Sequence, residues 1–416
     1  MLIVHTADVH IGVENYGFPD PLTRTSTRLN DFLSSFDEVV NYSIDNKADL
    51  VLMCGDAYKS RNPSQTHQRE FAKRIAEITK HNIPVFLLAG NHDSPNIRVQ
   101  ATALDIFNTL DAPYVNIGAE LKTHLIETKS GPIQIIALPW IRKGDFITSQ
   151  DTKGLSNTQI NKEIQKTITD IIKSEIENLN PEIPAILAGH VSIDSAKTSS
   201  EKSMMLGKDY ILLKSSITSN KLDYVALGHI HKHQILNDNP KIVYPGSLER
   251  VDFGEEKDVK GFCSIVLDPN QESGNREQEF NFIPVAARRF ITIRSKIKNS
   301  DTSPTETVIS QIKNHDISDC IVQVIIEIPA SKINDLNENK IRETLKEAHF
   351  IAAINKNIIE ETRIRLDKPL SETITPKEAL EAYLEERALD KTLKAQVMQR
   401  AENIINESPI DEDQIG

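Results

Sequence analysis

Cysteine is scarce in this sequence. Cys54, Cys263 and Cys320 are the only cysteines among 416 residues, and no two of them have the C-x-x-C spacing. Each lies in an apolar, strand-like stretch, which predicts buried thiols in a reducing compartment. A metal site built from closely spaced thiolates is therefore not expected.

Long apolar runs are also absent. The sequence nowhere contains 18 consecutive apolar residues, and Met1 leads directly into a strand-like segment without a basic n-region or a cleavable apolar stretch. We therefore expect neither a transmembrane helix nor a secretory signal of the usual kind. We expect a soluble, cytoplasmic protein with no membrane partner.

The sequence carries no excess of positive charge. The formal net charge is −12, which argues against a general polyanion-binding surface. The charge is unevenly distributed, because residues 370–416 hold 11 acidic and 5 basic residues and so contribute −6. A basic run without acidic residues comprises Arg288, Arg289, Arg294, Lys296 and Lys298. Such a run is either a solvated face or a set of phosphate contacts, and we retain it as a candidate DNA-binding set.

Five short apolar runs each end in residues that commonly bind metals. They are LIVHTADVH at 2–10, LVLMCGD at 50–56, PVFLLAGNHD at 84–93, AILAGH at 185–190 and YVALGHIH at 224–231. Each run is typical of a buried strand. Because α/β sheets hold their ligands beyond the carboxyl ends of the strands, we expect these terminal residues to meet at one site.

The polar residues at these ends form a candidate set of eight. They are Asp8, His10, Asp56, Asn91, His92, His190, His229 and His231. In D-x-H and H-x-H the two side chains project from the same side of an extended backbone, so each pair can chelate. The other seven histidines lack this placement and are predicted to be structural: His5, His67, His81, His124, His233, His315 and His349.

The chemistry of the set favours two divalent ions. Carboxylate, imidazole and amide ligands without thiolate suit manganese, iron or zinc in a dinuclear centre. Such a centre binds a phosphate and activates water for in-line attack. Asp56 stands alone after its strand and is the natural bridging carboxylate. His92 adjoins a ligand but exceeds the number needed, which suits a general acid or a donor to the transition-state charge.

The order D-x-H, G-D, G-N-H-D, G-H and G-H-x-H resembles the calcineurin-like metallophosphoesterase superfamily. DYVALGHIH at 223–231, YPGSLERVDF at 244–253 and KGF at 260–262 are similar to the SbcD family of DNA double-strand-break repair nucleases. The resemblance implies a first ion on the residues Asp8, His10, Asp56 and His231. It implies a second ion on Asp56, Asn91, His190 and His229, with His92 catalytic. It further implies manganese, a DNA substrate and a coiled-coil ATPase partner of the SbcC type.

The fold class expected is α/β, with a two-layered mixed-sheet metallophosphoesterase core over residues 1–284. The pattern restarts near Pro284, which predicts a small α+β capping domain at 285–366. Residues 367–416 are predicted to form a linker and two amphipathic helices, because Thr375, Pro376 and Glu378 form a capping signature. This helical pair either docks on the capping domain or, as we favour, binds the ATPase. Other expected elements are helices at 63–81, 97–110, 157–180 and 334–347 and strands at 350–354 and 359–364.

We predict a metal-dependent DNA exonuclease or endonuclease that acts, as one subunit of a complex, in repair, recombination and replication. One alternative is a metallophosphatase or phosphodiesterase on small or protein substrates. Another is a DNA-tethering protein without catalysis. The helices at 63–81 and 97–110 match the dimer-forming region of the family. Their apolar stripes either cover the sheet or form a homodimer, and we predict the homodimer.

Overall fold

The computed structural model describes residues 1–94, 101–141, 156–198, 211–359, 377, 380–381, 384 and 391–407. Residues Met1–Asn357 form one compact unit and residues Ile358–Gly416 form another. None of the helices within the described ranges is long and apolar enough to cross a membrane.

The first of two mixed sheets contains the strands nearest the N-terminus. Its order is β14-β13-β1-β2-β3-β4, made of β1 (Leu2–Thr6), β2 (Leu50–Cys54), β3 (Val85–Leu88), β4 (Val115–Gly118), β13 (Gly261–Leu267) and β14 (Glu277–Pro284). Strands β1 to β4 are parallel, and β13 and β14 add antiparallel pairs at one edge. The parallel strands therefore deliver their carboxyl ends to the same side.

The second sheet has the order β11-β12-β10-β7-β6-β5. It is made of β5 (Lys122–Thr128), β6 (Gly131–Leu138), β7 (Ala185–His190), β10 (Tyr224–Gly228), β11 (Gln234–Asp238) and β12 (Lys241–Tyr244). Its four central strands are parallel, and an antiparallel strand lies at each edge. This sheet also sends the ends of β7 and β10 in one direction.

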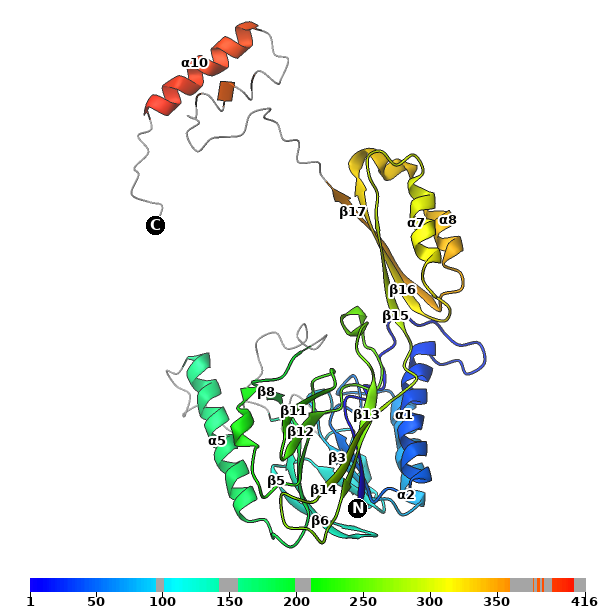
Figure 1. Ribbon diagram of the computed structural model, residues 1–416, viewed down its shortest axis with the longest axis vertical. Coiled ribbons are helices and arrows are strands. Elements are labelled where there is room, and N and C mark those ends of the chain that lie inside the picture. The colour runs from blue at the N-terminus through cyan, green and yellow to red at the C-terminus, as the bar shows by residue number, and fades with distance from the viewer. Residues whose placement is uncertain are drawn as a thin grey trace. The chain divides into compact units, whose positions relative to one another are not determined.

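The two sheets face each other across a buried core. Ile3, Leu52 and Phe86 of the first sheet belong to the same hydrophobic cluster as Ile186 and Ala226 of the second. Figure 1 shows α1 (Thr27–Asp45) and α2 (Gln65–Lys80) on one side of the strands and α5 (Asn157–Glu177) on the other. The predicted α/β class with mixed sheets is confirmed, and the helices at 63–81 and 157–180 are present.

A three-stranded sheet with its own core follows the two larger sheets. It consists of β15 (Phe290–Lys296), β16 (Ile321–Pro329) and β17 (Phe350–Ile359), accompanied by α7 (Pro304–Lys313) and α8 (Glu338–Thr344). Ile293, Val308, Val324 and Ile341 are fully buried in a separate cluster. The arrangement is that of a small α+β domain, and its boundaries at 285 and 366 stay a prediction.

Three expected elements differ from the structure. The strands expected at 350–354 and 359–364 are one continuous strand as far as Ile359, and residues 360–364 lie outside the described ranges. The helix expected at 334–347 is a 3-10 turn, η3 (Ala330–Asp335), followed by the shorter α8. The helix expected from residue 97 is α3 (Asp105–Thr109), and residues 101–104 are not helical.

A local hydrogen-bond pair explains the late start of α3. The Thr102 amide donates to Asp105 Oδ2 at 2.6 Å, and the Asp105 amide donates to Thr102 Oγ1 at 3.2 Å. Reciprocal bonds of this kind satisfy the first free amides of a helix and so define where it begins.

The C-terminal tail is helical where it is described. Lys377, Leu380, Glu381 and Leu384 are in helical conformation, and α10 spans Lys391–Glu407. Lys377 Nζ lies 2.5 Å from Glu402 Oε1, which joins the two helical segments, and the Leu384 side chain is buried. The expected helical pair is therefore present, whereas the capping residues Thr375, Pro376 and Glu378 lie outside the described residues.

Candidate metal centre

The eight candidate residues lie at the carboxyl ends of five parallel strands from both sheets. Asp8 and His10 follow β1, Asp56 follows β2, Asn91 and His92 follow β3, His190 ends β7, and His229 and His231 follow β10. Backbone bonds join the first two loops, because the Asp8 amide donates to the Gly55 carbonyl and the His10 amide donates to the Asp56 carbonyl. The structure thus brings the strand-end residues together, as the sequence predicted.

The backbone is strained at this convergence. Asp8, His10, Asp56 and His229 have φ angles of +53°, +50°, +53° and +94°, a region that non-glycine residues rarely occupy. The Gly90 backbone lies so close to Asp56 that a Cβ at position 90 would collide with the Asp56 carboxylate. Such strain persists only where the surrounding structure imposes it, and it is common at functional sites.

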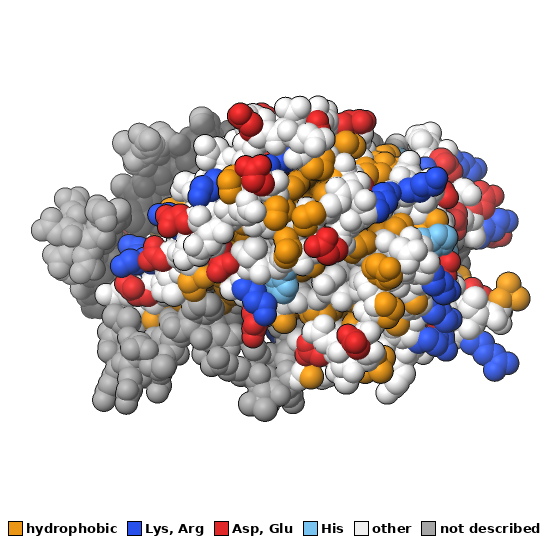
Figure 2. Space-filling view, turned by 90° about the horizontal axis from the view of Figure 1, so that it is seen from below, with side chains coloured by type: hydrophobic (Ala, Val, Ile, Leu, Met, Phe, Trp, Pro, Cys, Tyr) orange, Lys and Arg blue, Asp and Glu red, His pale blue; other side chains and the backbone are white. Residues whose placement is uncertain are grey.

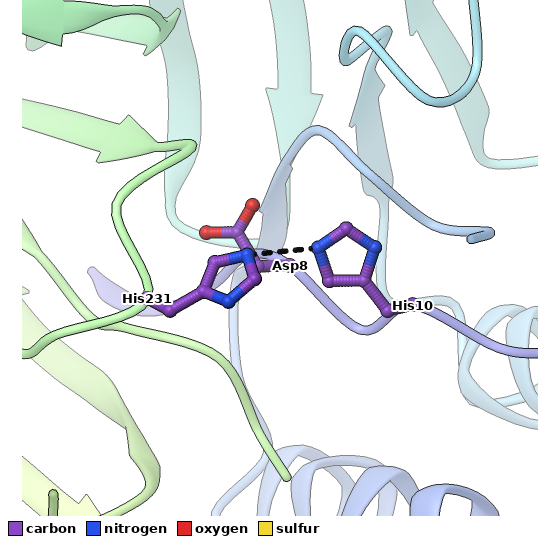
Figure 3. Close-up of side chains that lie close together, drawn as sticks. All are labelled: Asp8, His10 and His231. Carbon is purple, nitrogen blue, oxygen red and sulfur yellow. Dashed lines mark hydrogen bonds between the residues drawn. The ribbon is translucent and has the colours of Figure 1, made fainter. Parts of the chain in front are cut away.

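The first cluster consists of Asp8, His10 and His231, which are all buried (Figure 3). His10 Nε2 and His231 Nε2 are 3.0 Å apart. His231 Nδ1 lies 2.7 Å from Glu255 Oε1, so its proton is on Nδ1 and the Nε2 lone pair faces the cluster. Two neighbouring nitrogen ligands, each about 2.1 Å from one ion, would have a similar separation.

The second cluster consists of Asp8, Asp56 and His190. His190 Nδ1 donates to the Cys54 carbonyl at 2.7 Å, which turns the Nε2 lone pair toward Asn91 Oδ1 at 3.0 Å. Asn91 Oδ1 is also 3.0 Å from His229 Nδ1. The Asp56 carboxylate lies between the clusters, because its Oδ2 is 3.4 Å from His190 Nε2 and 3.7 Å from His10 Nε2.

These donor atoms fit cations. A nitrogen lone pair that faces an amide oxygen and a carboxylate oxygen is repelled by both unless positive charge lies between them. Burial lowers the pKa of His190, but the charges of Asp56 and Asp8 outweigh burial and raise that pKa to about 9. The pocket therefore stabilises positive charge at this point. Because the same atoms would hold divalent ions, the two clusters support a site for two divalent metals.

His92 lies at the edge of the two clusters and forms a third possible metal-binding group with His10 and Asp56. Its amide donates to Asp56 Oδ1 at 2.8 Å, and its Nδ1 donates to the Lys59 carbonyl at 2.7 Å. The ring meets His10 edge to face at 5.1 Å. Since the carbonyl bond occupies Nδ1, the nitrogen available to a substrate is Nε2.

A cleft of about 630 Å³ adjoins His92. The residues that line it include Lys59, Arg61 and His67, so two cationic residues, Lys59 and Arg61, lie along the approach to the clusters. His67 was predicted to be structural, and the structure places it in this wall with Nε2 3.1 Å from Glu14 Oε1. By contrast, His5 is fully buried between the Tyr224 hydroxyl and the Leu227 carbonyl, as a structural histidine should be.

Residues 1–233, more than half of the chain, match the calcineurin-like phosphoesterase family. The chain belongs to this family. The predicted metallophosphoesterase is thereby confirmed, and the strand-end clusters stay its candidate site for two divalent metals.

One relative is named as a DNA repair protein and another as part of a nuclease. The chain is 26% identical over 264 residues to the DNA double-strand break repair protein Mre11 of Archaeoglobus fulgidus, which covers 62% of this chain and 52% of that protein. It is 24% identical to the D component of nuclease SbcCD from Escherichia coli, with 61% of this chain and 62% of that protein covered. The resemblance to SbcD-type proteins is confirmed. The chain matches only about half to three fifths of the length of these relatives.

Among solved structures, a dimetal phosphatase from Danio rerio covers 68% of this chain and 98% of its own length. The sequence identity is 11% and the TM-score is 0.38.

The sequence analysis missed three residues that contact the two candidate metal clusters or the loops that carry them. Glu255 is buried, binds His231, and forms an ion pair with Lys260 Nζ at 2.7 Å. Burial alone would raise the pKa of Glu255, but His231 and Lys260 lower it. Asp93 accepts hydrogen bonds from the amides of Ala57, Tyr58 and Gly90 and so joins the loops after β2 and β3. Trp140, the single tryptophan, lies 5.1 Å from the His229 ring.

Only Asp93 left a signal in the sequence, as the last residue of G-N-H-D. Glu255 lies 24 residues from His231, and Trp140 has no motif around it. Both residues are distant in the sequence from the residues that they contact, so only the folded structure shows their roles.

Two of the five basic residues proposed for DNA have close acidic partners. Arg288 makes a bidentate pair with Asp31 at 2.6 and 2.7 Å and a second pair with Asp319. Arg289 pairs with Asp316 at 2.7 Å. The remaining three, Arg294, Lys296 and Lys298, are exposed along β15 and just after it. Arg288 thus joins α1 to the small domain, which is a structural use of its charge.

Proposed function

We propose that this phosphoesterase is a DNA nuclease that hydrolyses phosphodiester bonds and acts with an SbcC-type ATPase in repair and recombination. The observation that carries the proposal is the gathering of buried carboxylates and imidazoles from the strand ends beside His92, next to a cleft lined by Lys59 and Arg61. Polyanionic substrates are attracted to such cationic residues. The names of the two relatives support DNA as the substrate.

In this proposal, Asp8, His10, Asp56 and His231 hold one ion and Asp56, Asn91, His190 and His229 hold the other. Bound manganese would supply Lewis-acid activation of water and neutralise the phosphate charge. His92 is placed to donate a proton or hydrogen bond from Nε2 to the reacting phosphate oxygens. The Lys59 carbonyl fixes the ring in this orientation.

The route of DNA beyond the cleft is proposed to include Arg294, Lys296 and Lys298, which are exposed. Arg288 and Arg289 are less suited, because a carboxylate oxygen lies within 2.7 Å of each, whereas the nearest one to Lys296 Nζ, Glu327 Oε2, is 3.9 Å away. The face shown in Figure 2 mixes acidic and basic side chains. A mixed face attracts a polyanion weakly, so that face is not part of the proposed route.

A comparison of three substrates tests the proposed function. Linear duplex DNA, single-stranded circular DNA and p-nitrophenyl phosphate are incubated with Mn²⁺, with and without the ATPase. We expect both DNA substrates to be cut, the duplex faster with the ATPase and ATP, and EDTA to stop all cleavage. Hydrolysis of p-nitrophenyl phosphate alone would favour a phosphatase. Binding of DNA without cleavage of any substrate would favour a tethering protein.

We further propose a homodimer, for a different reason from the one that the sequence suggested. Phe71, Ile75 and Ile78 of α2 are buried against their own sheet, so this stripe is not available to a partner. Ile106, Leu110 and Tyr114 are 46%, 70% and 47% exposed beside a cleft of about 450 Å³ between α2 and α3.

Light scattering at micromolar concentration should therefore give twice the chain mass of 46.7 kDa. Leu110→Glu should give the monomer mass, because a charge would be buried at the interface. Leu125→Glu, at a 58% exposed position on β5, is the matched control and should remain dimeric. A monomeric wild type would refute the dimer.

The tail is proposed to bind the ATPase. Val397 lies on the exposed side of α10 with 36% of its surface accessible, and two short helices bury little apolar surface on their own. Truncation after Pro369 should leave metal content and the melting temperature of the remaining chain unchanged but abolish co-purification with the ATPase.

A point variant sharpens that experiment. Val397→Asp should weaken co-purification, whereas Gln399→Asp, another exposed position on α10, should not. Complex formation by the truncated chain at wild-type yield would show that the tail is not the binding segment.

A further inference from the structure

We infer that the turn around Phe253–Glu255 couples the position of the small domain to the geometry of the first metal cluster. Two adjacent carboxylates in this turn reach in opposite directions. Glu255 binds the cluster residue His231, and Glu256 binds Thr292 of β15. The inference rests on the proposed dinuclear centre and assigns to Glu256 a positioning role.

The metal side of the turn is closely held. Besides His231, Glu255 accepts bonds from the Val251 amide at 3.1 Å and the Ser247 hydroxyl at 3.3 Å, and it pairs with Lys260. All of these groups are buried. Because the carboxylate has no room to rotate, a movement of the turn backbone is passed to the His231 ring rather than absorbed by solvent.

The other side of the turn is held as directly. Glu256 Oε1 accepts from the Thr292 amide at 2.9 Å, and Oε2 accepts from the Thr292 hydroxyl at 2.5 Å. Gln323 of β16 donates to the same hydroxyl at 2.8 Å. The Phe253 ring packs on Phe290 at 5.0 Å. Strand β15 therefore contacts the turn directly, and β16 supports that contact through Thr292.

Because Glu255 and Glu256 are adjacent, the contact of Glu256 with β15 can change the geometry of the metal cluster as well as hold the small domain. One peptide unit separates Glu255 from Glu256, so a shift of β15 that carries Glu256 also displaces the carboxylate that orients His231. The domain junction has other supports, among them the pair of Arg288 with Asp31. Loss of the hydrogen bonds between Glu256 and Thr292 should thus weaken the link between β15 and His231, while the small domain stays attached to α1 through Arg288.

Metal binding provides the first test. The full chain is freed of metal and titrated with Mn²⁺ in a calorimeter. Direct hydrogen-bond partners of ligands usually change affinity by about 10- to 100-fold, and Glu256 acts one residue further away. We expect Glu256→Ala to weaken one of two binding steps by about 3- to 10-fold, and Glu256→Gln to restore most of it, because an amide oxygen still accepts from Thr292.

A matched control comes from the same domain. Thr307 donates its hydroxyl to Asp301 at 2.7 Å, a bond of the same kind as that from Thr292 to Glu256 but remote from the turn. Thr292→Val should weaken the same Mn²⁺ step as Glu256→Ala, whereas Thr307→Val should leave both steps at the wild-type affinity. Equal effects of the two valine variants would mean general destabilisation and would overturn the inference.

Reciprocity provides the second test, since coupling must act in both directions. The Thr292 amide donates to Glu256 and therefore reports the contact itself. Its hydrogen exchange in the wild type should slow when Mn²⁺ is added, and this slowing should vanish in Glu255→Gln. The control is the Ile297 amide, which donates to the Glu327 carbonyl away from the turn. Its exchange rate should be the same with and without Mn²⁺.

The outcomes separate this inference from the proposed function. Two Mn²⁺ steps in the wild type that are unchanged in Glu256→Ala, together with metal-independent exchange at Thr292, would overturn the coupling alone. A wild-type chain that binds no Mn²⁺ would overturn both the coupling and the dinuclear centre.

Discussion

Replacement of His92 by Gln should reduce DNA cleavage by about 10²- to 10⁴-fold, the usual effect of losing general acid catalysis. The variant should still bind two ions and DNA, because the four ligands proposed for each ion do not include His92, and the His92 amide that donates to Asp56 is retained. Single-turnover cleavage of a linear duplex in Mn²⁺ measures the rate, and metal analysis of the same sample measures occupancy.

The control is His81→Gln, which makes the same change at an exposed position at the end of α2. It should cleave at the wild-type rate. If His92→Gln cleaves at a near-normal rate, or if it loses its ions along with its activity, the assigned role is wrong.

Loss of Asp56 should affect both ions at once. Its Oδ2 lies 3.4 Å from His190 of one cluster and 3.7 Å from His10 of the other. Asp56→Ala is therefore expected to retain neither ion and to lose cleavage by about 10³-fold or more, since metal assistance contributes several kcal/mol. His10→Ala should chiefly weaken one ion. Elemental analysis after gel filtration gives the stoichiometry of each variant.

Folding must be separated from metal loss in this comparison. Asp56 has φ +53°, a conformation that asparagine also tolerates, so Asp56→Asn tests the lost charge with the backbone preserved. Both variants should give the wild-type circular dichroism spectrum. Full occupancy of two ions in Asp56→Ala would rule out the bridging carboxylate.

Much of the site could be predicted because its signals are local. Each apolar run reports a buried strand, and the residue after the run must lie at the carboxyl end of that strand. Parallel strands then bring Asp8, Asp56 and Asn91 to one edge without further information. The surplus of His92 over the ligand count was likewise readable from G-N-H-D.

Other features depended on the path of the chain. Periodicity shows that a strand is buried but not which neighbour buries it, so the division of twelve strands between two facing sheets had no signature in the sequence. The lengths of α3 and β17 were misjudged for a related reason. Thr102 and Asp105 start α3 by a reciprocal bond, and the spacing of apolar residues does not record such bonds.

The sequence by itself determined the ligand types, their order and the fold class, because these follow from residue chemistry and short-range patterns. Only the tertiary structure decided what surrounds the ligands. Glu255 binds His231, which is 24 residues away in the sequence, and Arg288 pairs with Asp31, which is 257 residues away. Both outcomes have one physical reason: a buried or half-buried charge needs a partner, and the partner is whichever group folding places within reach.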